Sequence, residues 1–125
     1  MNKDELIRLV QHDLIDLRPS QPLISIPIVL RIYKKMKLGL KFDSIQVADQ
    51  AVIVNGHHRY LASLLTNTKL EMTQCPLTSA KTITNWSEVQ LVEEDWDTPE
   101  HIMRLNTQDA QYNNIDLVRL LEMIA

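Results

Sequence analysis

The sequence has few of the residues that cross-link or sharply bend small proteins. Its 125 residues include one cysteine, Cys75, and two glycines, Gly39 and Gly56. One thiol cannot form an intramolecular disulfide, and without a cysteine cluster the usual structural zinc sites are excluded. No apolar run approaches the roughly 20 residues that a membrane span needs. We therefore expect residues 1–125 to form a single soluble domain that does not enter a membrane and is held by a hydrophobic core.

The N-terminal residues carry charges of both signs and precede no apolar signal core with a small-residue cleavage site. This pattern favours a cytoplasmic protein. Export by a secretion system that needs no signal would leave the same sequence features, so that alternative stays open.

The charges are distributed unevenly along the chain. Residues 1–87 hold 11 Lys and Arg against 7 Asp and Glu, whereas residues 88–125 hold 2 against 9. The acidic C-terminal part would repel a nucleic acid backbone and could instead form a face that docks on another protein. Five basic residues lie close together in the first part: Arg31, Lys34, Lys35, Lys37 and Lys41. They could attract phosphate, but for Lys34, Lys35 and Lys37 a solvated helix face is the preferred interpretation.

Hydrophobic spacing predicts an alternation of helices and strands. Helices are expected over residues 3–17, from Ser25 to near Gly39, over 57–66, from Asp97-Thr98-Pro99 to Asp109, and over 114–124. Strands are expected around Ile45 and Val47 and over 51–54, 70–76 and 86–96. The order predicts an α/β domain in which the last two helices form an added cap.

The placement of Gly56 is the most informative local feature. It separates a β-branched strand from a helix that starts at His57, so the first unpaired amides of that helix, at His57, His58 and Arg59, would be exposed. The positive end of a helix dipole binds anions, and glycine lets a phosphate approach the backbone. Arg59 adds a fork of donors suited to phosphate oxygens, and an imidazole can move a proton near neutral pH. Packing alone could also explain a glycine at this turn.

The segment from Val52 to Ala62, VIVNGHHRYLA, resembles the nucleotide-binding turn of the ParB/sulfiredoxin superfamily. The resemblance covers roughly residues 15–77 and includes a stretch around Pro19-Ser20-Gln21-Pro22. It implies a mixed sheet flanked by helices, with nucleotide phosphates bound at Asn55, Gly56, His58 and Arg59. It also implies ATP or CTP with Mg²⁺ as the cofactor.

Two departures from the superfamily narrow the expected chemistry. Sulfiredoxins carry their reactive cysteine where this chain has His57, so reduction of sulfinic acids is not expected. ParB proteins have a positively charged residue after the Gln-Pro pair, where this chain has Leu23. They also have a helix-turn-helix DNA-binding domain after the motif, which we do not expect in residues 1–125. Chromosome partitioning is therefore not expected either.

The C-terminal part is similar to the segment after the Gly-His-His-Arg motif in ParB-like domains of bacterial polymorphic toxins. This similarity rests on Asp95-Trp96-Asp97-Thr98-Pro99 and on Leu105 to Ala110. It makes Asp95 and Asp97 candidates for holding Mg²⁺ or for acting as a base. The simpler interpretation is that Asp97-Thr98-Pro99 caps a helix.

A zinc site built from His57, His58, His101 and Cys75 is not expected, because adjacent helical residues do not face one another and no known zinc spacing occurs. Trp86 and Trp96 are expected to anchor a core or an interface rather than to stack on nucleic acid bases.

Three functions remain open from the sequence. The first is an enzyme that carries out phosphoryl transfer or nucleoside triphosphate hydrolysis on a nucleotide or phosphorylated small molecule. In this enzyme Arg59 and the backbone amides of the turn would stabilise charge on the phosphate, and His57 or His58 would move the proton. The second is a ParB-like, toxin-type nuclease with Asp95 as a further catalytic residue, which the acidic charge disfavours. The third is a non-catalytic module that senses a nucleotide or binds a protein.

Overall fold

The computed structural model describes residues 3–12, 15–78 and 81–125, and over these residues the chain is a mixed α/β structure. The helices are α1 (Lys3–His12), α2 (Ile26–Lys37), α3 (His57–Thr66), α4 (Pro99–Tyr112) and α5 (Leu117–Ile124). The strands are β1 (Leu23–Ser25), β2 (Ile45–Ala48), β3 (Val52–Asn55), β4 (Met72–Gln74) and β5 (Gln90–Val92), and Trp86–Glu88 form a 3-10 helix, η1. None of the described helices combines the length and apolar character needed to cross a membrane.

The strands form two small sheets rather than the single sheet expected from the sequence. One has the order β3-β2-β4 and is mixed, because β2 pairs antiparallel with β3 and parallel with β4. The other consists of β1 and β5 paired in parallel, with Leu23 opposite Gln90. The sequence predicts no strand over residues 23–25, and only the helix start at Ser25 is expected there. Their strand character depends on a partner far along the chain, which local patterns do not reveal.

The first helix is shorter than its hydrophobic spacing predicts. It ends at His12, and Leu17, expected on the helix, is buried at a bend outside it. The neighbouring Arg18 explains the difference, because its N–H donates to the Ala51 carbonyl at 2.7 Å and its carbonyl accepts from the Ile53 N–H at 2.8 Å. Pairing with β3 requires an extended backbone at Arg18. The predicted helical position Leu14 lies outside the described residues.

The strand expected over residues 86–96 is also only partly present. Residues 86–88 form η1, and the strand β5 covers Gln90–Val92. Trp86 is buried, and its indole N–H donates to the Leu17 carbonyl at 2.8 Å. The turn at η1 thus places a large aromatic side chain in the core, as expected for Trp86, and residues 86–88 are not paired as a strand.

The β2-β3-α3 unit follows its prediction closely. β3 ends at Asn55, Gly56 comes next, and α3 begins at His57. The turn before β3 contains Gln50 and Ala51 at φ values of 66° and 59°, which tight hairpin turns require.

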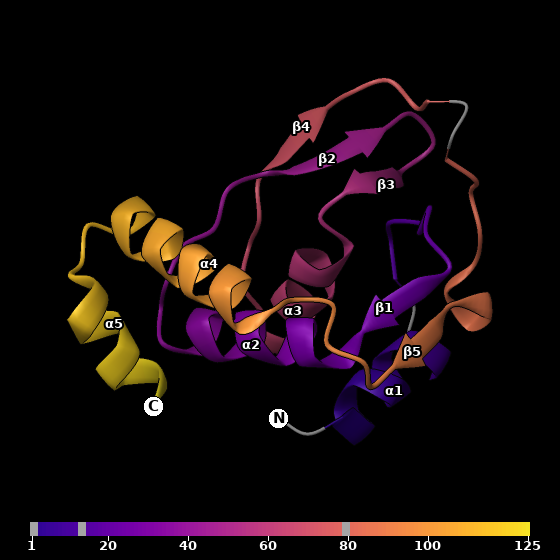
Figure 1. Cartoon of the computed structure of the whole chain (residues 1–125). Helices are drawn as coiled ribbons and strands as arrows, with labels where there is room; N and C mark the ends of the chain where they lie inside the picture. The colour runs from indigo at the N-terminus through magenta and orange to yellow at the C-terminus, as the bar shows by residue number, and fades with distance from the viewer. Residues whose placement is uncertain (1–2, 13–14, 79–80) are drawn as a thin grey trace.

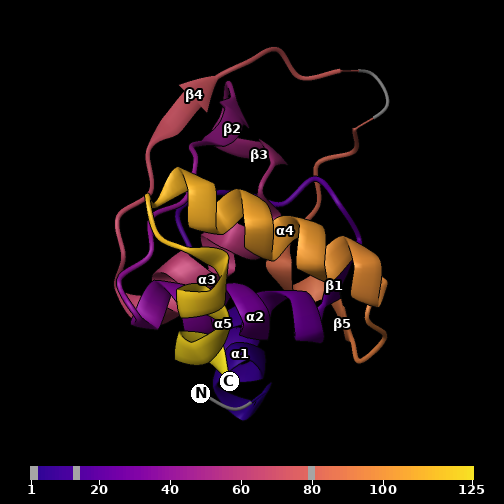
Figure 2. The same ribbon diagram turned by 60° about the vertical axis from the view of Figure 1, so that its left-hand side comes forward.

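The main core lies between the first three helices and the two sheets. Its fully buried side chains include Leu6, Ile24, Val29, Ile45 and Leu61. A second apolar cluster joins Leu40 to Ala110 and Leu120 and holds α4 and α5. In both views α4 lies between the three-stranded sheet and α2, with α5 next to it (Figures 1 and 2). The two C-terminal helices therefore cap the body of the protein, on the side where α3 begins.

Candidate functional site

The turn between β3 and α3 leaves a helix end free of side-chain bulk. Gly56 has φ +106°, and a Cβ atom there would lie 2.5 Å from Cγ2 of Ile45, too close for any residue but glycine. The first bond of the helix runs from the Tyr60 N–H to the Gly56 carbonyl, at 2.9 Å. The amides of His57, His58 and Arg59 precede that bond, so they belong to the positive end of the helix dipole.

This helix end forms one wall of a cleft of about 570 Å³. Asn55, Gly56, His57, His58 and Arg59 all line it, as do side chains of α2 and α4. The charged side chains in the lining are Arg31, Lys35, Arg59, Asp43, Asp97 and Asp109. Three positive and three negative groups give a cleft of balanced charge, which suits a small ligand better than a nucleic acid backbone.

His57 is buried and neutral. Its Nε2 accepts a hydrogen bond from the Ser20 N–H at 2.9 Å, so its own proton is assigned to Nδ1. Burial is the main reason that the pKa of His57 falls to about 4, and the charges of Lys81 and His58 lower it further. Among the described residues, Nδ1 of His57 is the enclosed side-chain polar atom that lacks a hydrogen-bond partner. The ring packs edge-on against Trp86, with centroids 6.3 Å apart.

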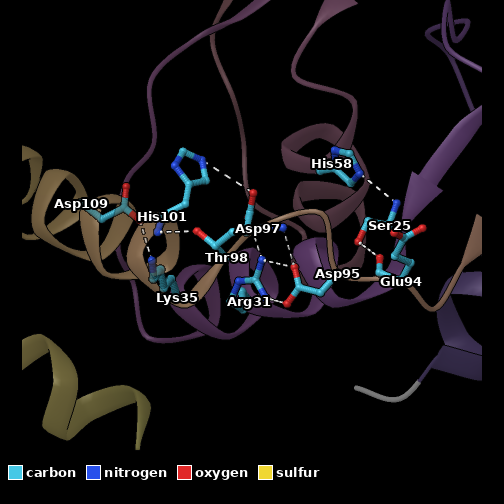
Figure 3. Close-up of polar contacts among 10 residues, drawn as sticks. All are labelled: Ser25, Arg31, Lys35, His58, Glu94, Asp95, Asp97, Thr98, His101 and Asp109. Atoms are coloured by element: carbon cyan, nitrogen blue, oxygen red, sulfur yellow. Dashed lines mark hydrogen bonds and ion pairs between the residues drawn. The ribbon is translucent and has the colours of Figure 1, made fainter.

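His58 has the same protonation pattern on the other side of the turn. Its Nε2 accepts from the Ser25 N–H at 3.0 Å, as drawn in Figure 3, which again assigns the proton to Nδ1. Burial lowers the pKa of His58 to about 4, while Asp97 opposes this effect and Arg31 adds to it. The half-exposed Trp96 packs edge-on against its ring at 5.2 Å. Both histidines of the turn are therefore neutral hydrogen-bond donors at physiological pH.

Arg59 lines the cleft but has protein partners. Its Nη1 donates to the carbonyl oxygens of Asp43 and Ser44 at 3.0 and 3.2 Å. Burial lowers the pKa of Arg59, with Asp43 and Asp109 opposing that effect, yet a guanidinium stays charged at any physiological pH. The two carbonyls use one of its nitrogens, so other donors of the fork remain for a ligand.

Arg31 on α2 connects the cleft to the segment before α4. It donates to Oδ1 of Asp95 at 2.9 Å and to Oδ2 of Asp97 at 2.7 Å (Figure 3). The hydrogen bond from Arg31 is the main reason that the pKa of Asp95 is lowered. Asp97 also lies 3.6 Å from Nε2 of His101, and Thr98 caps α4 by accepting from the His101 N–H, as the sequence predicts.

Lys35 contradicts the expectation of a solvated helix face on α2. It is only 5% exposed, and its Nζ donates to Oδ2 of Asp109 on α4 at 2.7 Å. A lysine is almost never buried without a partner, and here the partner comes from 74 positions later in the chain. The basic cluster is therefore partly internal and helps to hold α4 over the cleft.

The structure brings together most of the predicted site and adds residues to it. Asn55 to Arg59 line one cleft, whereas Asp95 is not part of its lining. The residues that the sequence did not mark as site residues are mainly on α4: His101, Asn106 and Asp109. Arg31 and Lys35 carried a weak signal, because a spacing of four places both on one face of a helix. Nothing in the sequence of α4 indicates which of its faces points toward Gly56.

The cleft has carboxylates that suit Mg²⁺ bound to a nucleotide. Within residues 3–12, 15–78 and 81–125, no three His, Cys, Asp or Glu side chains gather as a metal site of their own. Mg²⁺ on a nucleotide needs only one or two protein carboxylates, because phosphates and water complete its shell. Asp43, Asp97 and Asp109 line the cleft and fit that requirement.

Comparisons with known proteins leave the family open. No family model, curated protein or solved structure matches the chain. The resemblance to the ParB/sulfiredoxin superfamily therefore stays a prediction.

Proposed function

We propose that this chain binds a nucleotide or another phosphate ester in the cleft, with the phosphates at Asn55 to Arg59. One observation carries the proposal: the amide end of α3, opened by Gly56, lines a cleft that also contains Arg59, Arg31 and Lys35. Backbone amides and guanidinium groups are the donors that phosphate oxygens prefer. The volume of about 570 Å³ lies within the range of small-molecule sites.

The two histidines of the turn support binding more directly than proton transfer. Each uses Nε2 to accept from a backbone amide, and each has a pKa of about 4. A neutral imidazole with its proton on Nδ1 can donate to a phosphate oxygen without bringing a charge into the cleft. It cannot take up a proton without breaking its bond to Ser20 or Ser25. His58 is therefore proposed as a ligand donor, whereas Nδ1 of His57 is enclosed by protein and His57 contributes its backbone amide.

Phosphoryl transfer or hydrolysis is the reaction that the cleft could perform on such a ligand. His101 lines the cleft, is partly exposed and has Asp97 beside it, an arrangement that can orient an imidazole. In hydrolysis, His101 would take a proton from water while the water oxygen bonds to phosphorus. The bond to the leaving oxygen would break and its electron pair would leave with that oxygen. Mg²⁺, when bound, would neutralise part of the charge on the phosphates.

A non-catalytic, nucleotide-sensing module is the second candidate. It is favoured because Arg31 and Lys35, two cations of the cleft, are already paired with Asp97 and Asp109 of the α4 region. A bound phosphate would compete with these carboxylates and change how α4 is held. Nuclease activity has less support, because a cleft with balanced charge does not attract a nucleic acid backbone.

The first experiment measures binding. ATP, ADP, CTP and GTP, with and without Mg²⁺, are titrated into the protein by calorimetry. Arg59→Ala and Arg59→Lys should both weaken binding, since lysine restores the charge but not the fork of donors. Arg104→Ala is the matched control, because Arg104 is an exposed arginine on α4 outside the cleft lining. If no nucleotide binds the wild-type protein, or Arg104→Ala weakens binding equally, the proposal is wrong.

The second experiment separates the enzyme from the sensor. Release of inorganic phosphate from any nucleotide that binds is followed for the wild type and for His101→Gln. If the protein is an enzyme, the wild type should release phosphate, and His101→Gln should abolish this release while still binding the nucleotide. His12→Gln, at an exposed histidine of α1, serves as the control. Binding without turnover would support the sensor, and cleavage of added DNA or RNA that depends on Arg59 would support the nuclease.

A further inference from the structure

A buried amide on α4 has no hydrogen-bond partner among the residues that the structure describes. Asn106 lies near the middle of α4 and is only 5% exposed. Among the described residues, nothing forms a hydrogen bond with its side chain. Buried polar side chains are normally hydrogen-bonded, so a buried asparagine without a partner needs an explanation.

The amide of Asn106 remains accessible from the cleft. Asn106 is one of the lining residues, and its side-chain atoms are not among the fully enclosed ones. The lining of the cleft also includes apolar side chains: Ile102 and Leu105 on α4, and Phe42 before β2. An apolar pocket with a few unpaired polar groups is the usual form of a small-molecule site. The missing partner is therefore expected on a ligand.

We propose that Asn106 recognises the base of the bound nucleotide, with adenine as the best match. This inference rests on the function proposed above. The Asn106 Nδ2–H would donate to a ring nitrogen of the base, and Oδ1 would accept from its exocyclic amino group. Adenine presents that pair side by side at N7 and N6, and a primary amide such as that of asparagine pairs with both. The flat faces of the base would contact the apolar side chains of the lining, while the phosphates extend to the end of α3.

The test compares a ligand that has a base with one that has only phosphates. ATP, GTP and inorganic tripolyphosphate are titrated into the wild type and into Asn106→Leu, which has a similar volume but no amide. Gln111→Leu is the control, because it removes a primary amide from an exposed position of α4 outside the cleft lining. We expect Asn106→Leu to weaken ATP binding at least tenfold and to leave tripolyphosphate binding unchanged, with Gln111→Leu affecting neither. The wild type should bind ATP more tightly than GTP.

Several results would overturn the inference. If Asn106→Leu binds ATP as tightly as the wild type, or loses ATP and tripolyphosphate in the same proportion, the amide does not recognise the base. Equal affinity of the wild type for ATP and tripolyphosphate would also refute it, while leaving the phosphate site intact. If neither ligand binds the wild type, the proposed function is itself wrong and the inference falls with it.

A measurement without ligand distinguishes recognition from a structural role. If Asn106 exists for a ligand, replacing its unpaired buried amide with leucine should raise the melting temperature of the free protein. A lower melting temperature would mean that the amide supports the fold, which contradicts the inference.

Discussion

Replacing Gly56 with alanine should destabilise the protein more than the same change at Gly39. Both glycines have positive φ values, +106° and +91°, so an alanine is strained at either position. Such backbone strain costs of the order of 1–3 kcal/mol. The change also restricts the unfolded chain equally in both variants, so this contribution cancels in the comparison.

The surroundings of the two glycines differ. A methyl group added at Gly39 would have nothing within 4 Å, whereas one added at Gly56 would sit 2.5 Å from Cγ2 and 2.9 Å from Cβ of Ile45. Ile45 is fully buried in β2, and its Cβ cannot move without the strand. Forcing an extra methyl into a packed core costs about 1–3 kcal/mol. Gly56→Ala should therefore lose about that much more unfolding free energy than Gly39→Ala.

Urea unfolding followed by circular dichroism measures the difference. With an m-value of about 2 kcal/mol per M, a gap of about 2 kcal/mol separates the two midpoints by about 1 M. Equal midpoints for the two variants would refute the argument, because the contact with Ile45 would then have no energetic effect at the turn. A lower midpoint for Gly39→Ala would refute it as well.

Three further predictions concern the contacts around the cleft. Because the pKa of each turn histidine is about 4 when folded and near 6.5 when unfolded, unfolding free energy should be constant above pH 6.5 and fall toward pH 4. The slope of unfolding free energy against pH, measured by urea unfolding across that window, gives the number of protons taken up on unfolding. His58→Gln should lower that number by about one, and an unchanged slope would contradict the burial of His58. Lys35→Met should cost about 1–3 kcal/mol by leaving Asp109 unpaired, while adding Asp109→Leu should recover most of it; a double variant as unstable as the single one would show that the pair itself stabilises the fold. Trp86→Phe should cost about 1–3 kcal/mol in thermal unfolding, because the Leu17 carbonyl loses its donor, and a loss near zero would mean that water replaces the indole.

The turn at Gly56 and the elements around it could be predicted from the sequence, because short-range chemistry determines them. β-branched residues favour β2 and β3, glycine is required at the positive φ after them, and an apolar stripe on α3 begins directly afterwards. The prolines in the first turns of α2 and α4 and the Thr98 cap of α4 are equally local, so both helices begin where the sequence indicates. These local features are enough to place the proposed phosphate-binding residues, Asn55 to Arg59, on one turn.

Tertiary structure alone decided the contacts between distant parts of the chain. The pairing of Arg18 with β3 shortens α1, and the pairing of β1 with β5 creates a second sheet. The position of α4 buries Lys35 against Asp109 and brings Asn106 into the cleft. Spacing within a segment determines which side chains share a face, but it contains no information about which distant face lies opposite. The helix end that could bind phosphate was therefore predictable, whereas the cleft that surrounds it was not.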